Sequence, residues 1–331
     1  MRFDSRTRSN IDYLREFAAF LVVFGHALSY YGAAYAALPR YAAILEDMIY
    51  QVHVPLFFVI SGFLCHRQPV RPFYRKKALR ILVPFWFFAA LKLVYTSWIS
   101  GRFAHASSLS GQLYDAFVIG QTYWFAYAIF LMFLLAPLFW EKEESTAPKK
   151  AMAAFAVFTA FNIITSVGSI SVLPRVFQIG NTVKYLPFFL AGMILRFYCP
   201  RAKKLFARHR AWIVCLALAA AAASAAVYAF GVKVDPYVRK LITAFALMLP
   251  LLALANALPE NNRFLTLAGG LSYQIMLLDP FFKVVFFAVL GKLFGVSLAA
   301  AAAVAVLNFA LSILTCVIAR KIPVIKTLFG L

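Results

Sequence analysis

Acidic residues are scarce in this chain, which has only 12 Asp and Glu among 331 residues, and all charged residues together make up 14%. Soluble domains are nearer a quarter charged and half apolar, whereas this chain is 63% hydrophobic with a mean hydropathy of +0.80. The composition therefore excludes a disordered chain and an ordinary cytosolic enzyme. Because a membrane span needs roughly 20 apolar residues, and apolar residues are spread too evenly here for one buried core, the sequence predicts a polytopic membrane protein.

Cysteine is also infrequent, and its four positions show neither paired nor metal-ligand spacing. A secreted disulfide scaffold is therefore excluded, and we expect no metal site. The cysteines are typical of small apolar fillers in a helix bundle. They are Cys65, Cys199, Cys215 and Cys316.

The apolar residues fall into ten segments separated by charges and turn formers. We therefore expect an all-α membrane bundle of about ten transmembrane helices that forms one domain over 1–331. Pro and Gly within the segments do not exclude helices, since neighbouring helices can satisfy the freed backbone groups. The predicted spans are 14–31, 43–64, 79–99, 116–139, 151–170, 183–198, 211–230, 240–258, 271–290 and 296–319.

Basic residues are abundant: 33 Lys and Arg give a net charge of +21. On a soluble chain this excess would suggest nucleic-acid binding. Here most of the basic residues fall in alternate loops, as the positive-inside rule requires, so we expect no nucleic-acid partner. Both termini are predicted to be cytoplasmic, with 1–13 as a short basic tail. Ser145 and Ala207 should then lie inside, and Ala106 and Val234 outside.

The first predicted span contains two ionisable residues, Arg15 and His26. Such residues are costly within a membrane and often indicate function. Their separation of eleven residues places them on one helix face, about 16 Å apart along the axis. Arg15 would lie at the cytoplasmic mouth and His26 near the middle of the membrane. The alternative is an arginine at the lipid headgroups and a histidine satisfied by a neighbouring helix.

The second predicted span contains His53 near its outer end and Ser61-Gly62 towards its inner end. Small residues allow helices to approach closely, and this role suits Ser61 better than a nucleophile does. His53 could be part of a site or simply interfacial. Four cations then follow on the cytoplasmic side. They could anchor the helix to anionic lipid or bind a polyphosphate ligand. They are Arg75, Lys76, Lys77 and Arg80.

Four motifs in order resemble the acyltransferase-3 family of membrane O-acyltransferases. Residues 12–26 contain Arg-x10-His. Residues 53–64 read His-Val-Pro-Leu-Phe-Phe-Val-Ile-Ser-Gly-Phe-Leu, as in the fucose 4-O-acetylase-like branch. Residues 77–84 are similar to an Arg-x-x-Arg-Ile-x-Pro element, and 122–125 are similar to a Trp-Phe-Leu element in the fourth span. The resemblance covers essentially the whole chain and includes ten spans with inward termini.

The sequence departs from the family pattern at three places. Lys77 replaces the first arginine of its element, with one extra residue before Pro84. Tyr123 precedes the tryptophan where histidine is common. Asp279 occupies a position where the family has a late histidine, which places the acceptor side of the site in doubt. Asp279 and Lys283 are spaced i,i+4 and should neutralise each other.

The resemblance implies transfer of an acyl group, usually acetyl from acetyl-CoA as co-substrate, to a sugar hydroxyl of a cell-envelope or lipid-linked glycan. His26 would be the general base or carry the acyl group, with Arg15 at the mouth. Arg80, Lys77 and Arg75 would bind the donor. The acceptor or pocket residues would be His53, Ser61, Tyr123, Trp124 and Asp279, although Tyr123 and Trp124 could equally be core aromatics.

The expected location is the bilayer of the bacterial cytoplasmic (inner) membrane. Two other functions fit the same residues. One is a transporter or flippase for a glycan intermediate, with His26, Asp279 and Lys283 as a proton relay. The other is a structural partner subunit with a decayed site.

Overall fold

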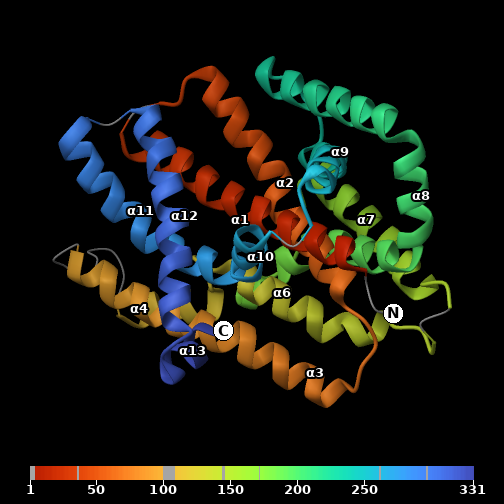
Figure 1. Cartoon of the computed structure of the whole chain (residues 1–331), viewed down its shortest axis with the longest axis horizontal. Coiled ribbons are helices and arrows are strands. Elements are labelled where there is room, and N and C mark those ends of the chain that lie inside the picture. The colour runs from red at the N-terminus through yellow and green to blue at the C-terminus, as the bar shows by residue number, and fades with distance from the viewer. Residues whose placement is uncertain are drawn as a thin grey trace.

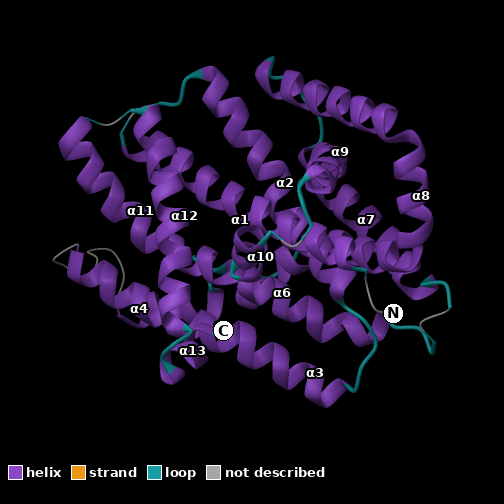
Figure 2. Ribbon diagram, viewed as in Figure 1, coloured by secondary structure: helices purple, strands orange, loops and turns teal. Residues whose placement is uncertain are grey.

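The structure is a computed structural model that describes residues 4–35, 37–99, 109–143, 146–170, 172–260, 262–295 and 297–331. Within this part of the chain every regular element is a helix and no strand occurs (Figure 2). The predicted all-α class is therefore confirmed. Ser145 and Ala106, for which we predicted a side of the membrane, lie outside the described residues.

The helices follow one another with short connections. In chain order they are α1 Ser5–Ala34, α2 Arg40–Leu64, α3 Val70–Lys77, η1 Ala78–Leu82, α4 Val83–Ile99, α5 Leu109–Leu113, η2 Tyr114–Ile119, α6 Trp124–Leu135, η3 Ala136–Phe139, α7 Lys149–Val167, η4 Val176–Gln178, α8 Ile179–Ala229, α9 Pro236–Ala257, α10 Arg263–Gly270, α11 Ser272–Phe294, α12 Leu298–Ala319 and α13 Pro323–Phe329.

Among the described residues, eight helices are long and apolar enough to cross a membrane, or up to nine if the bent pair Leu109–Ile119 and Trp124–Phe139 forms one span. The predicted segments 183–198 and 211–230 fall on the two sides of a kink at His209, where two helices run together within α8 (Figure 1). The two segments are separate helices joined without a loop. Lys and Arg interrupt hydropathy, but they are good helix formers, so the basic stretch between the two segments stays helical.

Helix α1 runs through the middle of the bundle and packs against α2, α9, α10, α11 and α12 (Figure 1). It begins at Ser5 because the side chain of Asp4 accepts a hydrogen bond from the Thr7 backbone N–H at 2.7 Å, a standard N-cap. Tyr13 joins α1 to the segment that precedes α10, since its hydroxyl accepts a hydrogen bond from the backbone N–H of Asn262 at 3.1 Å. Residues 5–13 are therefore part of α1 and not a separate tail.

Helices α2 and α8 cross in backbone contact at two glycines. A Cβ on Gly62 would lie 1.8 Å from the carbonyl oxygen of Phe189, and one on Gly192 would lie 2.0 Å from that of Val59. Both approaches exclude any larger residue. The predicted role of the Ser61-Gly62 step in close helix packing is thus confirmed for Gly62.

Several segments that the charge pattern placed on the cytoplasmic side meet at one end of the bundle, which we call the N-terminal end. Lys203 of α8 contacts the carboxylate of Asp4 at 2.9 Å, and Ser5 donates to Glu260 at 2.8 Å. Hydrogen bonds from Thr7 and then Lys203 hold the pKa of Asp4 below its usual value. The last residues reach the same region, because Gly330 packs against Pro84 and the carbonyl of Arg80.

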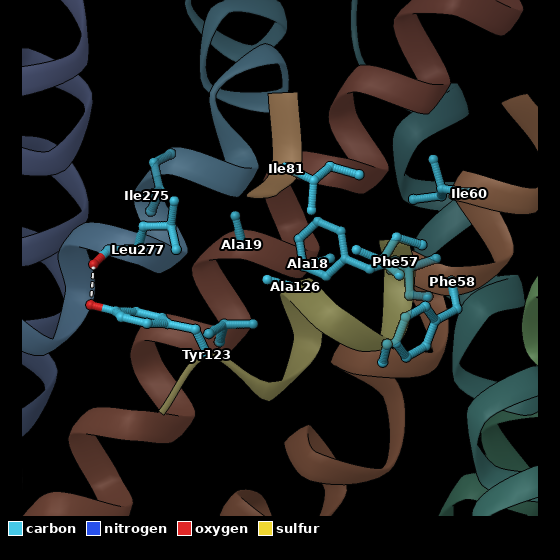
Figure 3. Packing of buried hydrophobic residues seen from close by; sticks show 14 of the residues in the cluster. Ala18, Ala19, Phe57, Phe58, Ile60, Ile81, Tyr123, Ala126, Ile275 and Leu277 are labelled. Carbon is cyan, nitrogen blue, oxygen red and sulfur yellow. Dashed lines mark hydrogen bonds between the residues drawn. The ribbon is translucent and has the colours of Figure 1, made fainter. Parts of the chain in front are cut away.

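The core is aliphatic and aromatic, and it is continuous between α1, α2, α6, α8 and α11 (Figure 3). Tyr123 is 6% exposed and its hydroxyl donates to the carbonyl of Leu277 at 3.0 Å. This bond ties the start of α6 to α11 just before Asp279. Asp279, two residues further along α11, is a fully buried carboxylate in this core.

Candidate functional site

His26 of α1 and Asp279 of α11 form a hydrogen-bonded pair within the bundle, 2.8 Å between Nδ1 and Oδ2. The carboxylate is fully buried, whereas the imidazole side chain is 36% exposed. An ionised carboxylate accepts only, so Nδ1 carries a proton, and in the neutral imidazole Nε2 keeps its lone pair. Nε2 has no hydrogen-bond partner among the described residues, and it is the atom available for chemistry.

Asp279 is held from the other side by α12. Asn308 donates from Nδ2 to Oδ1 of Asp279 at 2.8 Å, and Ser312 donates to Oδ1 of Asn308 at 3.3 Å. Lys283 lies one turn along α11, with Nζ 3.5 Å from Oδ2 of Asp279. The predicted Asp279–Lys283 contact is present, and Asp279 also positions His26, which the spacing on α11 did not predict.

An aromatic side chain links His26 to the second predicted histidine. The ring of Tyr50 lies 6.3 Å from that of His26 and 5.1 Å from that of His53. His53 is 2% exposed, and its Nδ1 donates to the carbonyl of Ile49 at 2.6 Å. His53 is therefore a core residue of α2 beside the His26–Asp279 pair, and not an interfacial one.

The other predicted pocket residues differ in their surroundings. Trp124 stacks on Tyr185 with ring centroids 5.4 Å apart, so one face of its ring is already covered. Tyr123 is engaged with α11 as described above. Ser61 is half-buried, and no hydrogen bond joins it to a base among the described residues. None of these three contacts the His26–Asp279 pair.

The predicted donor residues lie at the N-terminal end of the bundle. Lys77 is half-buried, and its ammonium stands 3.4 Å from the centroid of the Phe133 ring, a close cation–π contact. It lies within electrostatic range of Arg15 and Arg80, so the structure brings together charges from α1 and from 77–80. Arg15 is partly balanced by Asp12 at 3.7 Å, and Arg75 and Arg80 are exposed.

The extra residue before Pro84 has a structural counterpart. Between α3 and α4 the helix passes through a π-helical turn at Ala78–Leu82, which includes Arg80. A π turn closes its hydrogen bonds over i→i+5 in place of i→i+4, so it holds one residue more than an α turn. The insertion is thereby absorbed without breaking the helix that carries Lys77 and Arg80.

Two adjoining cavities open beside these cations at the N-terminal end of the bundle. One has a volume of about 330 Å³ and is lined by Cys65, Arg67, Trp140 and Arg196, among others. The other, of about 650 Å³, shares Arg67 and Trp140 and adds Lys142 and Lys150.

Neither Arg75 nor Arg80 lines the two cavities, whereas Lys77 lies within electrostatic range of Cys65. Sequence reasoning missed this lining, because its residues come from four separate segments.

Cys65 does not offer a nucleophile in the first cavity. It follows the last residue of α2 and is 4% exposed. Burial raises the pKa of its thiol to about 11, and only the thiolate is reactive. The four cysteines are free thiols.

Asn308 is the functional candidate that the sequence analysis overlooked. An amide within the apolar helix α12, followed one turn later by Ser312, is an unusual pair for a membrane span. The sequence alone could have indicated Asn308 as a candidate. It could not have indicated that Asp279 is the partner of Asn308, because Asp279 lies on a different helix.

A comparison with protein families shows which family the chain belongs to. The model of the acyltransferase domain matches residues 8–318. The chain belongs to the acyltransferase family. The matched residues extend from the first to the last of the described helices that are long and apolar enough to cross a membrane.

Two curated relatives match part of the chain. The nodulation protein NolL of Sinorhizobium fredii is 27% identical over 211 residues, which are 61% of this chain and 52% of NolL. NolL of Mesorhizobium japonicum is 26% identical over 196 residues, 56% of this chain and 47% of NolL. The chain thus spans about half the length of the curated relatives it matches. No solved structure matches it.

Proposed function

We propose that the protein transfers an acyl group, acetyl in the simplest case, from acyl-CoA to a sugar hydroxyl of a cell-envelope or lipid-linked glycan. The observation that carries this proposal is the His26–Asp279 pair, in which Asp279 is fully buried and Nε2 of His26 has no hydrogen-bond partner among the described residues. The family match favours acyl transfer over the transporter alternative. The motif in 53–64 suggests a fucose 4-O-acetylase-like acceptor, and we place the enzyme in the bacterial cytoplasmic membrane.

The chemistry follows from the orientation of the imidazole. Asp279 holds His26 in the Nδ1–H tautomer, so Nε2 can take the proton of an acceptor hydroxyl as the oxygen attacks the thioester. A carboxylate in this position also stabilises the imidazolium that forms. His26 as an acyl carrier uses the same free nitrogen.

The donor would enter from the N-terminal end, which we propose is cytoplasmic. Its phosphates would meet the charges of Lys77, Arg80 and Arg15, with Arg67 and Arg196 at the cavity wall. From Cys65 at this wall to His53 beside the His26–Asp279 pair is about 18 Å along α2, at 1.5 Å per residue. The pantetheine arm of CoA is the part of the donor that would cover this distance.

The acceptor would approach from the opposite side of the pair. Tyr50, whose ring lies beside that of His26, would line this approach, and Trp124 keeps one ring face uncovered by Tyr185. The glycan and the surrounding bilayer are thus the proposed partners, and acyl-CoA is a co-substrate rather than a resident cofactor.

A transfer assay tests this function without knowledge of the acceptor. The purified full chain in lipid nanodiscs is mixed with radiolabelled acetyl-CoA and an envelope extract from cells that lack the gene, which supplies unmodified glycan. We expect label to appear in the saccharide fraction, with mass spectrometry showing one acetyl group added per modified sugar. Absence of transfer, together with unchanged envelope glycans in the deletion strain, would contradict the proposal.

Replacing both Lys77 and Arg80 with Ala should raise the KM for acetyl-CoA by about tenfold or more, because charge-assisted contacts to phosphate are lost. The kcat should change little. Lys321→Ala is the control, since Lys321 is an exposed cation near the C-terminus outside this cluster. If the double variant alters only expression or lipid extraction, the cluster is a membrane anchor.

A further inference from the structure

Two ammonium groups lie beside the buried carboxylate of Asp279. Lys283 is 15% exposed, and its described polar contact is Asp279 Oδ2 at 3.5 Å. Lys92 of α4 donates to the hydroxyl of Thr122 at 3.0 Å and lies within electrostatic range of both Lys283 and Asp279. One negative charge thus faces two positive charges and also accepts from His26. Charges within a membrane are normally paired with opposite charges. Lys283 and Lys92 together carry one positive charge more than Asp279 balances, and an anionic ligand would pair with it.

The backbone around the site offers little stabilisation for an anion. His26, Asp279, Lys283 and Lys92 all lie inside helices, where backbone N–H groups are committed to the helical hydrogen bonds. Acyl transfer requires a donor group aimed at the oxygen that becomes negative in the tetrahedral intermediate. Side chains must therefore supply it.

Lys283 has the right position for this task. His26 Nδ1 and Lys283 Nζ contact the same oxygen of Asp279, at 2.8 and 3.5 Å, so the two nitrogens are at most about 6.3 Å apart. Resting on the proposed function, we propose that Lys283, supported by Lys92, binds the oxyanion formed from the thioester carbonyl. The site would thus have a cationic oxyanion hole in place of one built from backbone N–H groups.

The acceptor oxygen forms a bond to the thioester carbon, its proton moves to Nε2 of His26, and the carbonyl π electrons move to oxygen beside Lys283. Collapse restores the carbonyl and breaks the carbon–sulfur bond. The proton on Nε2 then passes to the departing thiolate, which leaves the ester, free CoA and neutral His26.

Two CoA analogues test the anion site without any acceptor. S-carboxymethyl-CoA carries a carboxylate near the position of the reacting carbonyl, and S-ethyl-CoA is a neutral thioether of similar length. Isothermal titration of the full chain in nanodiscs should show at least tenfold tighter binding of S-carboxymethyl-CoA. Lys283→Met should abolish this preference while S-ethyl-CoA binds as before, and Lys92→Met should reduce it.

Lys240→Met is the matched control, because Lys240 is also half-buried in a span but donates to the hydroxyl of Tyr185 at 3.2 Å. It should leave the preference intact. Binding of S-ethyl-CoA reports folding of each variant, and Lys283→Gln replaces Lys283→Met if the latter fails to fold. In the transfer assay Lys283→Met should lower kcat by about 100-fold with little change in the KM for acetyl-CoA.

The outcomes separate the two proposals. Equal binding of both analogues by the unmodified protein, or an intact preference in Lys283→Met, would overturn the oxyanion role alone. So would a Lys283→Met variant that keeps its kcat and loses only acceptor affinity, since the cations would then bind an anionic acceptor. Failure of both analogues and of acetyl-CoA to bind would overturn the proposed function itself.

Discussion

Replacing His26 with Gln is expected to lower turnover by on the order of 10³-fold while acyl-CoA binding stays unchanged, as general acid–base catalysis contributes about 10²–10⁴-fold. The glutamine amide can still donate to Asp279 and fill most of the imidazole space, but it has no basic nitrogen. The phosphate contacts lie about 16 Å away along α1. Product formation and acyl-CoA binding should be measured separately on the same preparation.

His53→Gln is the control for this substitution. His53 is buried beside Tyr50 and bonds only to the backbone of α2, so the same change there should cost at most a few-fold in turnover. If His26→Gln retains near-normal product formation with normal binding, His26 has no chemical role. Should His53→Gln then be the inactive variant, His53 becomes the candidate base.

Replacing Asp279 with Asn should also lower kcat by on the order of 10³-fold, through the tautomer of His26. Asn308 donates to the Oδ1 position at 2.8 Å, so the new amide keeps its oxygen there and turns its NH₂ group towards His26. That group donates to Nδ1, which moves the imidazole proton to Nε2 and removes the base. An effect of this size is known where a carboxylate orients a catalytic histidine.

A second substitution on α12 distinguishes this mechanism from damage to the fold. Asn308→Asp, added to Asp279→Asn, accepts from the new amide and turns its oxygen back to His26 Nδ1. We expect recovery of roughly tenfold or more in kcat, whereas a disrupted fold would not recover. Asp47→Asn is the matched control, since Asp47 is also a largely buried carboxylate, paired with Arg239 away from His26. It should reduce stability and leave kcat nearly intact.

Much of the fold could be predicted because membrane helices are determined locally. Runs of apolar residues define where helices lie, and the eleven-residue spacing in α1 places Arg15 and His26 on one face whatever the helix packs against. The basic stretch before the kink at His209 is helical, which hydropathy could not show because it reports burial in lipid and not backbone conformation. The π turn at Ala78–Leu82 could be suspected only as one residue too many before Pro84.

The sequence by itself determined an all-helical membrane protein, the resemblance to acyltransferases, and the candidates Arg15, His26 and Lys77. Only the tertiary structure decided which polar residues meet. Asp279 lies 253 positions from His26 and on another helix, and Asn308 on a third completes the group. A span's composition shows that a buried carboxylate needs a partner, but the rotation of each helix in the bundle selects that partner. Here that rotation assigned Asp279 to His26 as well as to Lys283, its neighbour on α11.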